Sequence, residues 1–319
     1  MPLDIVHSVC PHDCPSACAI EVELIDGRRI GRVRGASAQS YTRGVVCAKV
    51  ARYAERQHHP ARLSQPLRRA GEKGIGVAAF VPISWEDALD EVAEGLTGAA
   101  QRYGSEAVWP YYYAGTMGLV QRDGINRLRH AMRYSREHLS ICSMLSDTGW
   151  LAGVGVKRGI DGREIAKSDL IVVWGGNPVS TQVNVMTHVG TARRERGAKL
   201  VVVDPYRTAT AERADLHLAP LPGTDGALAC AVMQVLFKEG YADRAYMARY
   251  TDDPEGLEAH LATRDPTWAA GITGISEDEI VGFARLYGRA KPEIVLSPRP
   301  KRRRRRSMSP LRRHHSAAL

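Results

Sequence analysis

The feature that most constrains this chain is a group of four cysteines near its N-terminus. Cys10, Cys14 and Cys18 are separated by three residues each, and Cys47 follows after 28 more. Short spacers between three thiolates, with a distant fourth, suit the compact core of a cubane iron–sulfur cluster. The spacing therefore predicts a 4Fe–4S site held by these four cysteines.

Zinc and disulfides are the alternatives for the same cysteines. Zinc sites usually combine two C-x2-C segments, or cysteines with histidines, and the triplet spacing fits neither arrangement although His12 lies within it. A disulfide framework is typical of small chains in oxidising compartments, which nothing in this sequence indicates. Zinc stays open as the second interpretation, and structural disulfides rank last.

Length and composition indicate a globular protein of about two domains. The chain has 319 residues, of which 44% are hydrophobic, and this is enough to build substantial cores. No apolar run reaches the ~20 residues that span a bilayer, and the N-terminus lacks the basic start and apolar core of a secretory signal. A cytoplasmic location without a membrane span is therefore expected by default.

The net charge of +9 comes from the C-terminal tail. Nine of the 44 Lys and Arg residues, and no acidic residue, lie after Pro298, and the other 35 basic residues balance the 35 acidic ones. The tail, residues 298–319, has no hydrophobic periodicity and is expected to be disordered. It could bind polyanions in a salt-dependent way. A basic run alone is a weak motif, so an unrelated, out-of-frame end is favoured and nucleic-acid binding is not expected.

The N-terminal half predicts a hairpin, a capped helix and a strand. Two strand-like segments flank Asp26-Gly27, which is a hairpin signal beside the cysteines. Ser84 and Asp87 stand before an apolar stripe with helical spacing, which predicts a helix with an N-terminal cap. Residues 107–109, with the tyrosines after them, resemble a strand.

From residue 169 onward the sequence predicts a parallel α/β sheet. Strands are expected at 170–174, 200–203, 216–218 and 294–296, with helices at about 182–196 and 227–238 and another capped by Ser276. Loops at the carboxyl ends of such strands receive ligands. The predicted fold class is therefore α/β, with a small N-terminal iron–sulfur domain of antiparallel strands followed by a doubly wound, Rossmann-like domain.

Two aspartates follow strand and loop segments of this domain. The carboxylate of Asp204 or Asp225 could accept two hydrogen bonds from a purine such as guanine. Turn or helix-cap roles are the ordinary alternative and, taken alone, the more common one. No G-x-G-x-x-G fingerprint accompanies them, so an NAD site is not favoured.

Six short motifs follow one another along the chain. They are Cys10-Pro-His-Asp-Cys-Pro-Ser-Ala-Cys18, Thr42-Arg-Gly-Val-Val-Cys-Ala-Lys49, Ile83-Ser-Trp-Glu-Asp-Ala-Leu89, Gly175-Gly-Asn-Pro178, Val203-Asp-Pro205 and Pro222-Gly-Thr-Asp225. In this order they resemble the molybdopterin oxidoreductases of the dimethyl sulfoxide reductase family, over residues 1–297. The resemblance implies molybdenum or tungsten bound by pterin guanine dinucleotide, a 4Fe–4S cluster, and two-electron chemistry with electron transfer between them.

The resemblance also assigns roles to single residues. Lys49 is expected between cluster and pterin, where its positive charge would favour the reduced cluster. The four cysteines of the first motifs are expected to hold the cluster. The residues expected to bind one pterin guanine dinucleotide, with Asp204 or Asp225 as the guanine partner, are Asn177, Asp204, Arg207, Thr224 and Asp225.

The resemblance implies that Cys142 is the protein ligand of molybdenum or tungsten, because it lies where family members carry this ligand, and a soft thiolate suits these metals. A buried structural cysteine is the alternative. Ser143 and Ser146 compete for this role, and Cys230 is expected in a core. Formate dehydrogenases of the family usually have His after the ligand, so Ser143 counts against formate. Sulfur oxyanions, polysulfide, nitrate and N-oxides are the candidate small-molecule substrates.

Four segments are expected: a cluster domain at 1–62, an α/β segment of the molybdopterin-binding region at 63–165, a Rossmann-like dinucleotide domain at 166–297 and the tail at 298–319. Family chains are much longer, so a truncated or frameshifted oxidoreductase and a poor catalyst are expected. An electron-transfer partner protein or subunit is expected too. Two other functions stay open: an iron–sulfur electron-transfer or assembly module without its own catalysis, and a polyanion-binding protein acting through its tail.

Overall fold

The chain forms two compact units in the computed structural model. The structure describes residues 4–12, 14–111, 124–137, 144–156 and 158–290, and the backbone of 293–296. The first unit comprises residues up to 140 except the segment Cys14–Ser16, which groups with the second unit and residues 141 onward. The predicted disordered tail and the predicted metal ligand Cys142 lie outside the described residues.

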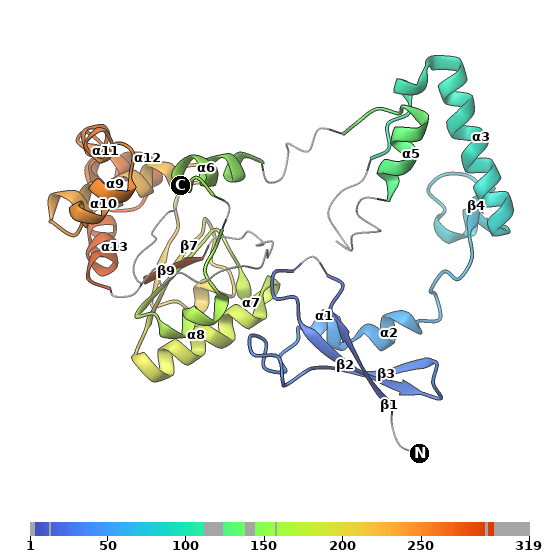
Figure 1. The fold of residues 1–319 in the computed structure, drawn as a ribbon, viewed down its shortest axis with the longest axis horizontal. Helices are drawn as coiled ribbons and strands as arrows, with labels where there is room; N and C mark the ends of the chain where they lie inside the picture. The colour runs from blue at the N-terminus through green and yellow to red at the C-terminus, as the bar shows by residue number, and fades with distance from the viewer. Residues whose placement is uncertain are drawn as a thin grey trace. The chain divides into compact units, whose positions relative to one another are not determined.

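A three-stranded antiparallel sheet forms the N-terminal part of the first unit, drawn in blue in Figure 1. Its strands are β1 (Asp4–Val9), β2 (Ala19–Ile25) and β3 (Arg29–Gly35), in the order β1-β2-β3. Asp26 (φ 55°) and Gly27 (φ 69°) both have positive φ between β2 and β3. Two such residues suit the tight hairpin turns that match strand twist, and the predicted hairpin is confirmed.

Two short helices complete this part of the unit. Helices α1 (Ala48–Ala51) and α2 (Tyr53–Gln57) pack against β3. A side chain at Gly35 would clash with the carbonyl oxygen of Gly44, so the close approach of these two segments requires glycine. This approach holds the loop that leads to Cys47 beside the sheet. A small core lies beneath, made by Cys18, Ile20, Val22, Val33 and Val50.

The remainder of the first unit holds a second small sheet and a long helix. Strands β4 (Leu67–Arg69) and β5 (Phe80–Pro82) pair antiparallel, with the 3-10 turn η1 (Gly76–Ala79) between them. Helix α3 (Trp85–Tyr103) follows, and α5 (Ile125–Met132) comes later. The Ser84 hydroxyl accepts the backbone N–H of Asp87 at 3.0 Å, which confirms the predicted helix cap.

The strand expected at residues 107–109 is wrong. Ser105–Ala107 form the 3-10 turn η2, and the described residues after it, up to Tyr111, belong to no strand. Strand preference of valine and aromatic residues depends on neighbours to pack and pair with. No strand among the described residues pairs with this segment, so its composition alone does not make it a strand.

The second unit is built on a four-stranded parallel sheet. Its strands are β6 (Leu170–Trp174), β7 (Lys199–Val203), β8 (Leu216–Leu218) and β9 (Glu293–Leu296), in the order β8-β7-β6-β9. The predicted parallel α/β sheet is therefore confirmed. The helices and 3-10 turns around it are α6 (Met144–Val154), η3 (Gly162–Lys167), α7 (Pro178–Thr181), α8 (Val183–Arg196), η4 (Ala211–Arg213), α9 (Asp225–Lys238), α10 (Arg244–Tyr250), α11 (Pro254–Leu261), α12 (Pro266–Thr273) and α13 (Glu277–Arg289).

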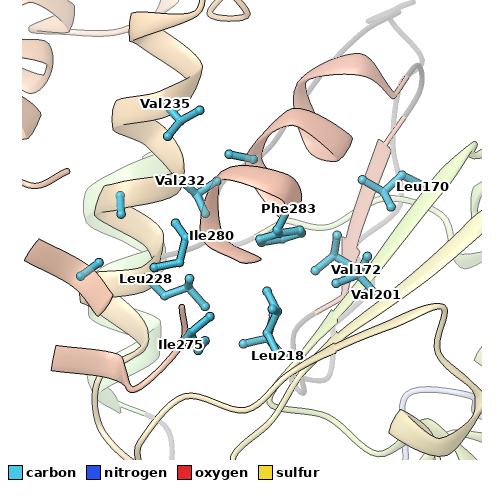
Figure 2. Close-up of a cluster of buried hydrophobic side chains, with 14 residues drawn as sticks. Leu170, Val172, Val201, Leu218, Leu228, Val232, Val235, Ile275, Ile280 and Phe283 are labelled. Carbon is cyan, nitrogen blue, oxygen red and sulfur yellow. The ribbon is translucent and has the colours of Figure 1, made fainter. Parts of the chain in front are cut away.

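Helices cover both faces of this sheet, because alternate strand residues point to opposite faces. Val172 and Val201 face a core shared with α9, α12 and α13, as Figure 2 shows. Ile171 and Val202 face a second core shared with α8. Burial on both faces explains why the strands are continuous apolar runs rather than alternating ones. No helix of the described residues is long and apolar enough to cross a membrane.

Replacing Ser276 with alanine is expected to lower the free energy of unfolding by about 1 kcal/mol. Ser276 caps α13 in a capping box: its hydroxyl accepts the Glu279 N–H at 3.3 Å, and the Glu279 carboxylate accepts the Ser276 N–H at 3.1 Å. Urea unfolding followed by circular dichroism measures the change. Ser276→Thr keeps the hydroxyl that accepts the Glu279 N–H and donates to its carboxylate, and it should stay near wild type; equal losses for both variants would argue against the cap.

Candidate functional site

Three of the four predicted cluster ligands lie together in the first unit. Cys18 stands just before β2 and is buried, and Cys10 stands just after β1. The Cys10 N–H donates to the Cys18 carbonyl oxygen at 2.8 Å, which continues the β1–β2 pairing beyond the strands. Cys47 precedes α1, and both Cys10 and Cys47 pack against the core that contains Cys18.

Tyr53 adjoins the same cysteines from α2. Burial raises the pKa of the Tyr53 hydroxyl, and nearby thiolate charge on Cys10 and Cys47 raises this pKa further. The His12 ring lies 5.5 Å from the Tyr53 ring, tilted by 41°. Its Nε2 is buried without a hydrogen-bond partner among the described residues. Tyr53 therefore lies near both Cys10 and Cys47, with the His12 ring beside its own.

Cys14 belongs to a different unit from the other three cysteines. It belongs to the segment that groups with the second unit, where its thiol donates to the Thr181 carbonyl oxygen of α7 at 3.4 Å. Within the described part of the chain, no three His, Cys, Asp or Glu side chains are arranged so that they could hold a metal ion. The four-cysteine ligand set thus stays a prediction. Its donors are all thiols, which fit an iron–sulfur cluster and not a hard cation.

The residues predicted to lie near the cluster or to bind the metal differ in exposure and in the unit to which they belong. Lys49 lies exposed in α1, two residues after Cys47. Ser146 is exposed in α6, whereas Ser143, like Cys142, lies outside the described residues. Cys230 is partly buried on α9, and burial raises the pKa of its thiol. Among these residues, Lys49 alone is in the same unit as the three gathered cysteines.

The predicted dinucleotide residues lie on loops at one edge of the parallel sheet. The Gly175 N–H donates to the Val203 carbonyl oxygen at 2.8 Å, and the Asp204 N–H donates to the Leu218 carbonyl oxygen at 3.0 Å. Strands β6, β7 and β8 therefore end in register, and the loops that carry Asn177, Asp204 and Asp225 leave the same edge. This is the edge where ligands bind in open α/β sheets.

Asp225 begins helix α9 and is held by a tryptophan. The indole N–H of Trp174, at the end of β6, donates to Asp225 Oδ1 at 2.7 Å. The neighbouring Thr224 hydroxyl donates to the Leu221 carbonyl oxygen at 2.7 Å, within the turn before the helix. A carboxylate in the first turn is favourable for the helix dipole. Asp225 stays partly exposed, so its carboxylate is accessible to a ligand.

Asp204 is less accessible than Asp225. It is 8% exposed, and its Oδ1 accepts the Tyr206 N–H at 3.2 Å, as in an Asx turn. The His217 Nε2 lies 3.0 Å from its carbonyl oxygen. Arg207, the residue directly after Tyr206, is exposed. Asp204 therefore shapes this loop, and Arg207 offers its charge to solvent.

Asn177 takes part in a network that sequence reasoning missed. The Thr210 hydroxyl donates to Asn177 Oδ1 at 2.7 Å and accepts the Val179 N–H at 3.2 Å. The amide nitrogen of Asn177 donates to the Ser180 hydroxyl at 3.3 Å. Thr210 and Trp174 are the two supporting residues absent from the predicted set. No spacing signal could have found them, because both act across contacts distant in sequence.

Comparison with known families matches nearly the whole described chain. A sequence model described as "Molybdopterin oxidoreductase Fe4S4 domain" matches residues 3–59, and one described as "Molybdopterin oxidoreductase" matches residues 62–306. The resemblance inferred from the six motifs is confirmed.

Individual relatives match over nine tenths of this chain. "Probable oxidoreductase YoaE" of Bacillus subtilis (strain 168) is 36% identical over 91% of this chain and 42% of its own length. "Putative dimethyl sulfoxide reductase chain YnfE" of Escherichia coli (strain K12) is 29% identical over 91% of this chain and 40% of its own. Formate dehydrogenases are also among the relatives. The chain spans about two fifths of the curated relatives it matches.

A solved structure shares the fold. The acetylene hydratase from Pelobacter acetylenicus matches with a TM-score of 0.61 and 23% identity, over 91% of this chain and 39% of that chain. A match at this identity establishes the fold alone. It agrees with the predicted class, antiparallel strands followed by a doubly wound α/β domain.

Proposed function

Because the chain belongs to the molybdopterin oxidoreductase family, we propose that it binds one pterin guanine dinucleotide at the β6–β7–β8 edge and a 4Fe–4S cluster at its N-terminal cysteines. The family's two domains imply both cofactors, with molybdenum or tungsten on the pterin. The observation that best supports the dinucleotide site is the common edge from which the loops of Asn177, Asp204 and Asp225 leave.

The residues of this edge fit the chemistry of a guanine dinucleotide. The amide of Asn177 and the guanidinium of Arg207 can donate to phosphate oxygens, whereas the single hydroxyl proton of Thr224 goes to the Leu221 carbonyl oxygen. The accessible carboxylate of Asp225 can accept from the guanine N–H groups, and its exposure favours it over Asp204 as guanine partner. Gly175 has a positive φ of 63°, and a Cβ atom on it would have no other group of the described residues within 4 Å. The loop surface is therefore open at Gly175.

At the N-terminal site the cluster would be held by Cys10, Cys14, Cys18 and Cys47. Lys49 would place a positive charge beside the cluster. When bound, the metal–pterin group supplies two-electron redox chemistry and the cluster passes electrons singly. The role of Cys142 as metal ligand, the substrate class and the electron-transfer partner are proposals of the same kind. The segment boundaries at 62, 165 and 297, and the cytoplasmic location, stay predictions from sequence.

Metal and nucleotide analysis of the purified chain tests this function. We expect protein made in a molybdopterin-producing host and purified without oxygen to contain about four iron and about four sulfide, molybdenum or tungsten, and guanosine monophosphate after acid hydrolysis. Iron and sulfide alone would favour an electron-transfer or assembly module. Salt-sensitive nucleic-acid binding without metal would favour a polyanion-binding protein.

Asp225→Asn is expected to lower the bound guanine nucleotide by about tenfold. The carboxylate is charged and offers two acceptor oxygens, whereas the amide is neutral and offers one. Nucleotide released per chain is the measurement. Asp243→Asn is a matched control, since Asp243 caps α10 and its side chain accepts the Tyr246 N–H away from the edge. Equal nucleotide content in wild type and Asp225→Asn would remove Asp225 from the site.

A further inference from the structure

Thr210 is a buried hydroxyl that reaches the loop after β6 from a distant part of the chain. It is 0% exposed and stands just before η4, 33 residues after Asn177. Its two contacts are Asn177 Oδ1 at 2.7 Å, on that loop, and the Val179 N–H at 3.2 Å, in the first turn of α7 directly after it. The buried hydroxyl therefore restrains the end of the loop and the start of the helix together.

The hydrogen-bond inventory of Thr210 fixes the orientation of the Asn177 amide. A hydroxyl has one proton and two lone pairs, so Thr210 accepts the Val179 N–H and still has its own proton to donate. Thr210 is fully buried, and Asn177 Oδ1 is its acceptor among the described residues, so a flipped amide would leave this buried proton without a partner. The NH₂ group is turned to the opposite side, where one proton reaches the Ser180 hydroxyl. The second proton is available to an acceptor on a ligand.

Local capping does not explain this arrangement. Asn177 is the residue before α7, but its side chain makes no capping bond with that helix. Its carbonyl oxygen accepts the backbone N–H groups of Ser180 and Thr181, each at 3.0 Å, as the residue before a helix ordinarily does. Its side chain bonds to the hydroxyls of Thr210 and Ser180 and not to the N–H groups of the helix.

We propose that Thr210 is a positioning residue that presents Asn177 as a hydrogen-bond donor to a phosphate oxygen of the pterin guanine dinucleotide. This inference rests on the proposed function. It adds the direction of one hydrogen bond to that function: Asn177 donates and the ligand accepts. A ligand that has a donor at this position would not form the bond. Phosphate oxygens are acceptors only, so they match a fixed amide donor.

Three variants test the proposal through nucleotide content rather than activity. Thr210→Val has nearly the same shape but no hydroxyl, and we expect about tenfold less guanosine monophosphate released per iron. Thr210→Ser keeps the hydroxyl and should restore the content to within about twofold of wild type. Asn177→Asp keeps an oxygen for Thr210 but removes the donor, and it should lose as much nucleotide as Thr210→Val.

The double variant separates positioning from general damage to the loop. If Thr210 acts through Asn177, adding Thr210→Val to Asn177→Asp should lower the content little further, because residues of one network are not additive. Fully additive losses, wild-type content in Thr210→Val, or no recovery in Thr210→Ser would each overturn the inference. Wild-type protein without guanine nucleotide would instead refute the proposed function, and the inference with it.

Discussion

Protein with Cys47 replaced by serine is expected to leave anaerobic purification with at least about tenfold less iron than wild type and without visible absorbance from a cluster. Cys47 packs against the core that contains Cys18, beside Cys10. Serine keeps the size of the side chain but exchanges a soft sulfur donor for a hard oxygen, which iron–sulfur clusters do not favour. Iron and sulfide analysis with an absorption spectrum measures the loss, and Cys14→Ser is expected to bleach the protein likewise.

Cys230→Ser is the matched control for this experiment. Cys230 is a partly buried cysteine on α9, in the unit that does not contain Cys47, and burial raises the pKa of its thiol. The same chemical change there should leave iron content unaltered. Equal iron loss in both variants would point to damage during purification rather than to ligation. One zinc and no iron in native wild-type protein would overturn the cluster assignment altogether.

The parallel sheet could be predicted from sequence because its strands are buried on both faces. Residues 170–174 and 200–203 are nearly unbroken apolar runs, and the structure buries alternate side chains in two separate cores. The starts of helices α3 and α13 could also be predicted. Ser84 and Ser276 cap them by accepting the backbone N–H of the residue three positions later. Signals of this kind depend only on neighbouring residues.

Elements stabilised mainly by pairing were less predictable. Strand β1 was not expected from its sequence, and all six of its residues are exposed, so no burial pattern marks it. Its backbone pairs with β2 along its full length, from Asp4 opposite Leu24 to Val9 opposite Ala19. The opposite error occurred at residues 107–109, where strand-forming side chains have no partner strand among the described residues. In both places, pairing with a neighbouring strand decides whether the segment is a strand, and the amino-acid composition of the segment does not reveal this pairing.

The candidate site shows the same division. Loops carrying Asn177, Asp204 and Asp225 could be expected at one edge, because parallel strands present their carboxyl ends together. The residues that support these loops could not be predicted from sequence. Thr210 bonds to Asn177 across 33 residues, and Trp174 bonds to Asp225 across 51 residues. The ligand role of Cys14 stays a prediction, because its segment groups with the second unit and Cys10, Cys18 and Cys47 belong to the first.

Phe283→Ala is expected to lower the free energy of unfolding by about 3–5 kcal/mol. Phe283 is 1% exposed on α13 and lies within the larger core of the second unit, as Figure 2 shows. Its ring centre is 6.5 Å from that of Trp174 and 6.2 Å from that of Tyr287. Removing the ring leaves a cavity against the sheet and ends both aromatic contacts. A domain is typically stable by about 5–15 kcal/mol, so the variant would be close to unfolding.

Two further variants decide whether this loss comes from the core and whether it reaches the site. Urea unfolding should show Leu145→Ala, at a side chain that is 87% exposed, within about 0.5 kcal/mol of wild type. Phe283→Leu keeps most of the volume but changes the surface against which Trp174 packs. Because the Trp174 indole N–H holds Asp225, a stable Phe283→Leu protein should still bind less guanine nucleotide. Wild-type nucleotide content in that variant would mean that Trp174 holds its position without Phe283, and that the core stabilises the unit without orienting its ligand loop.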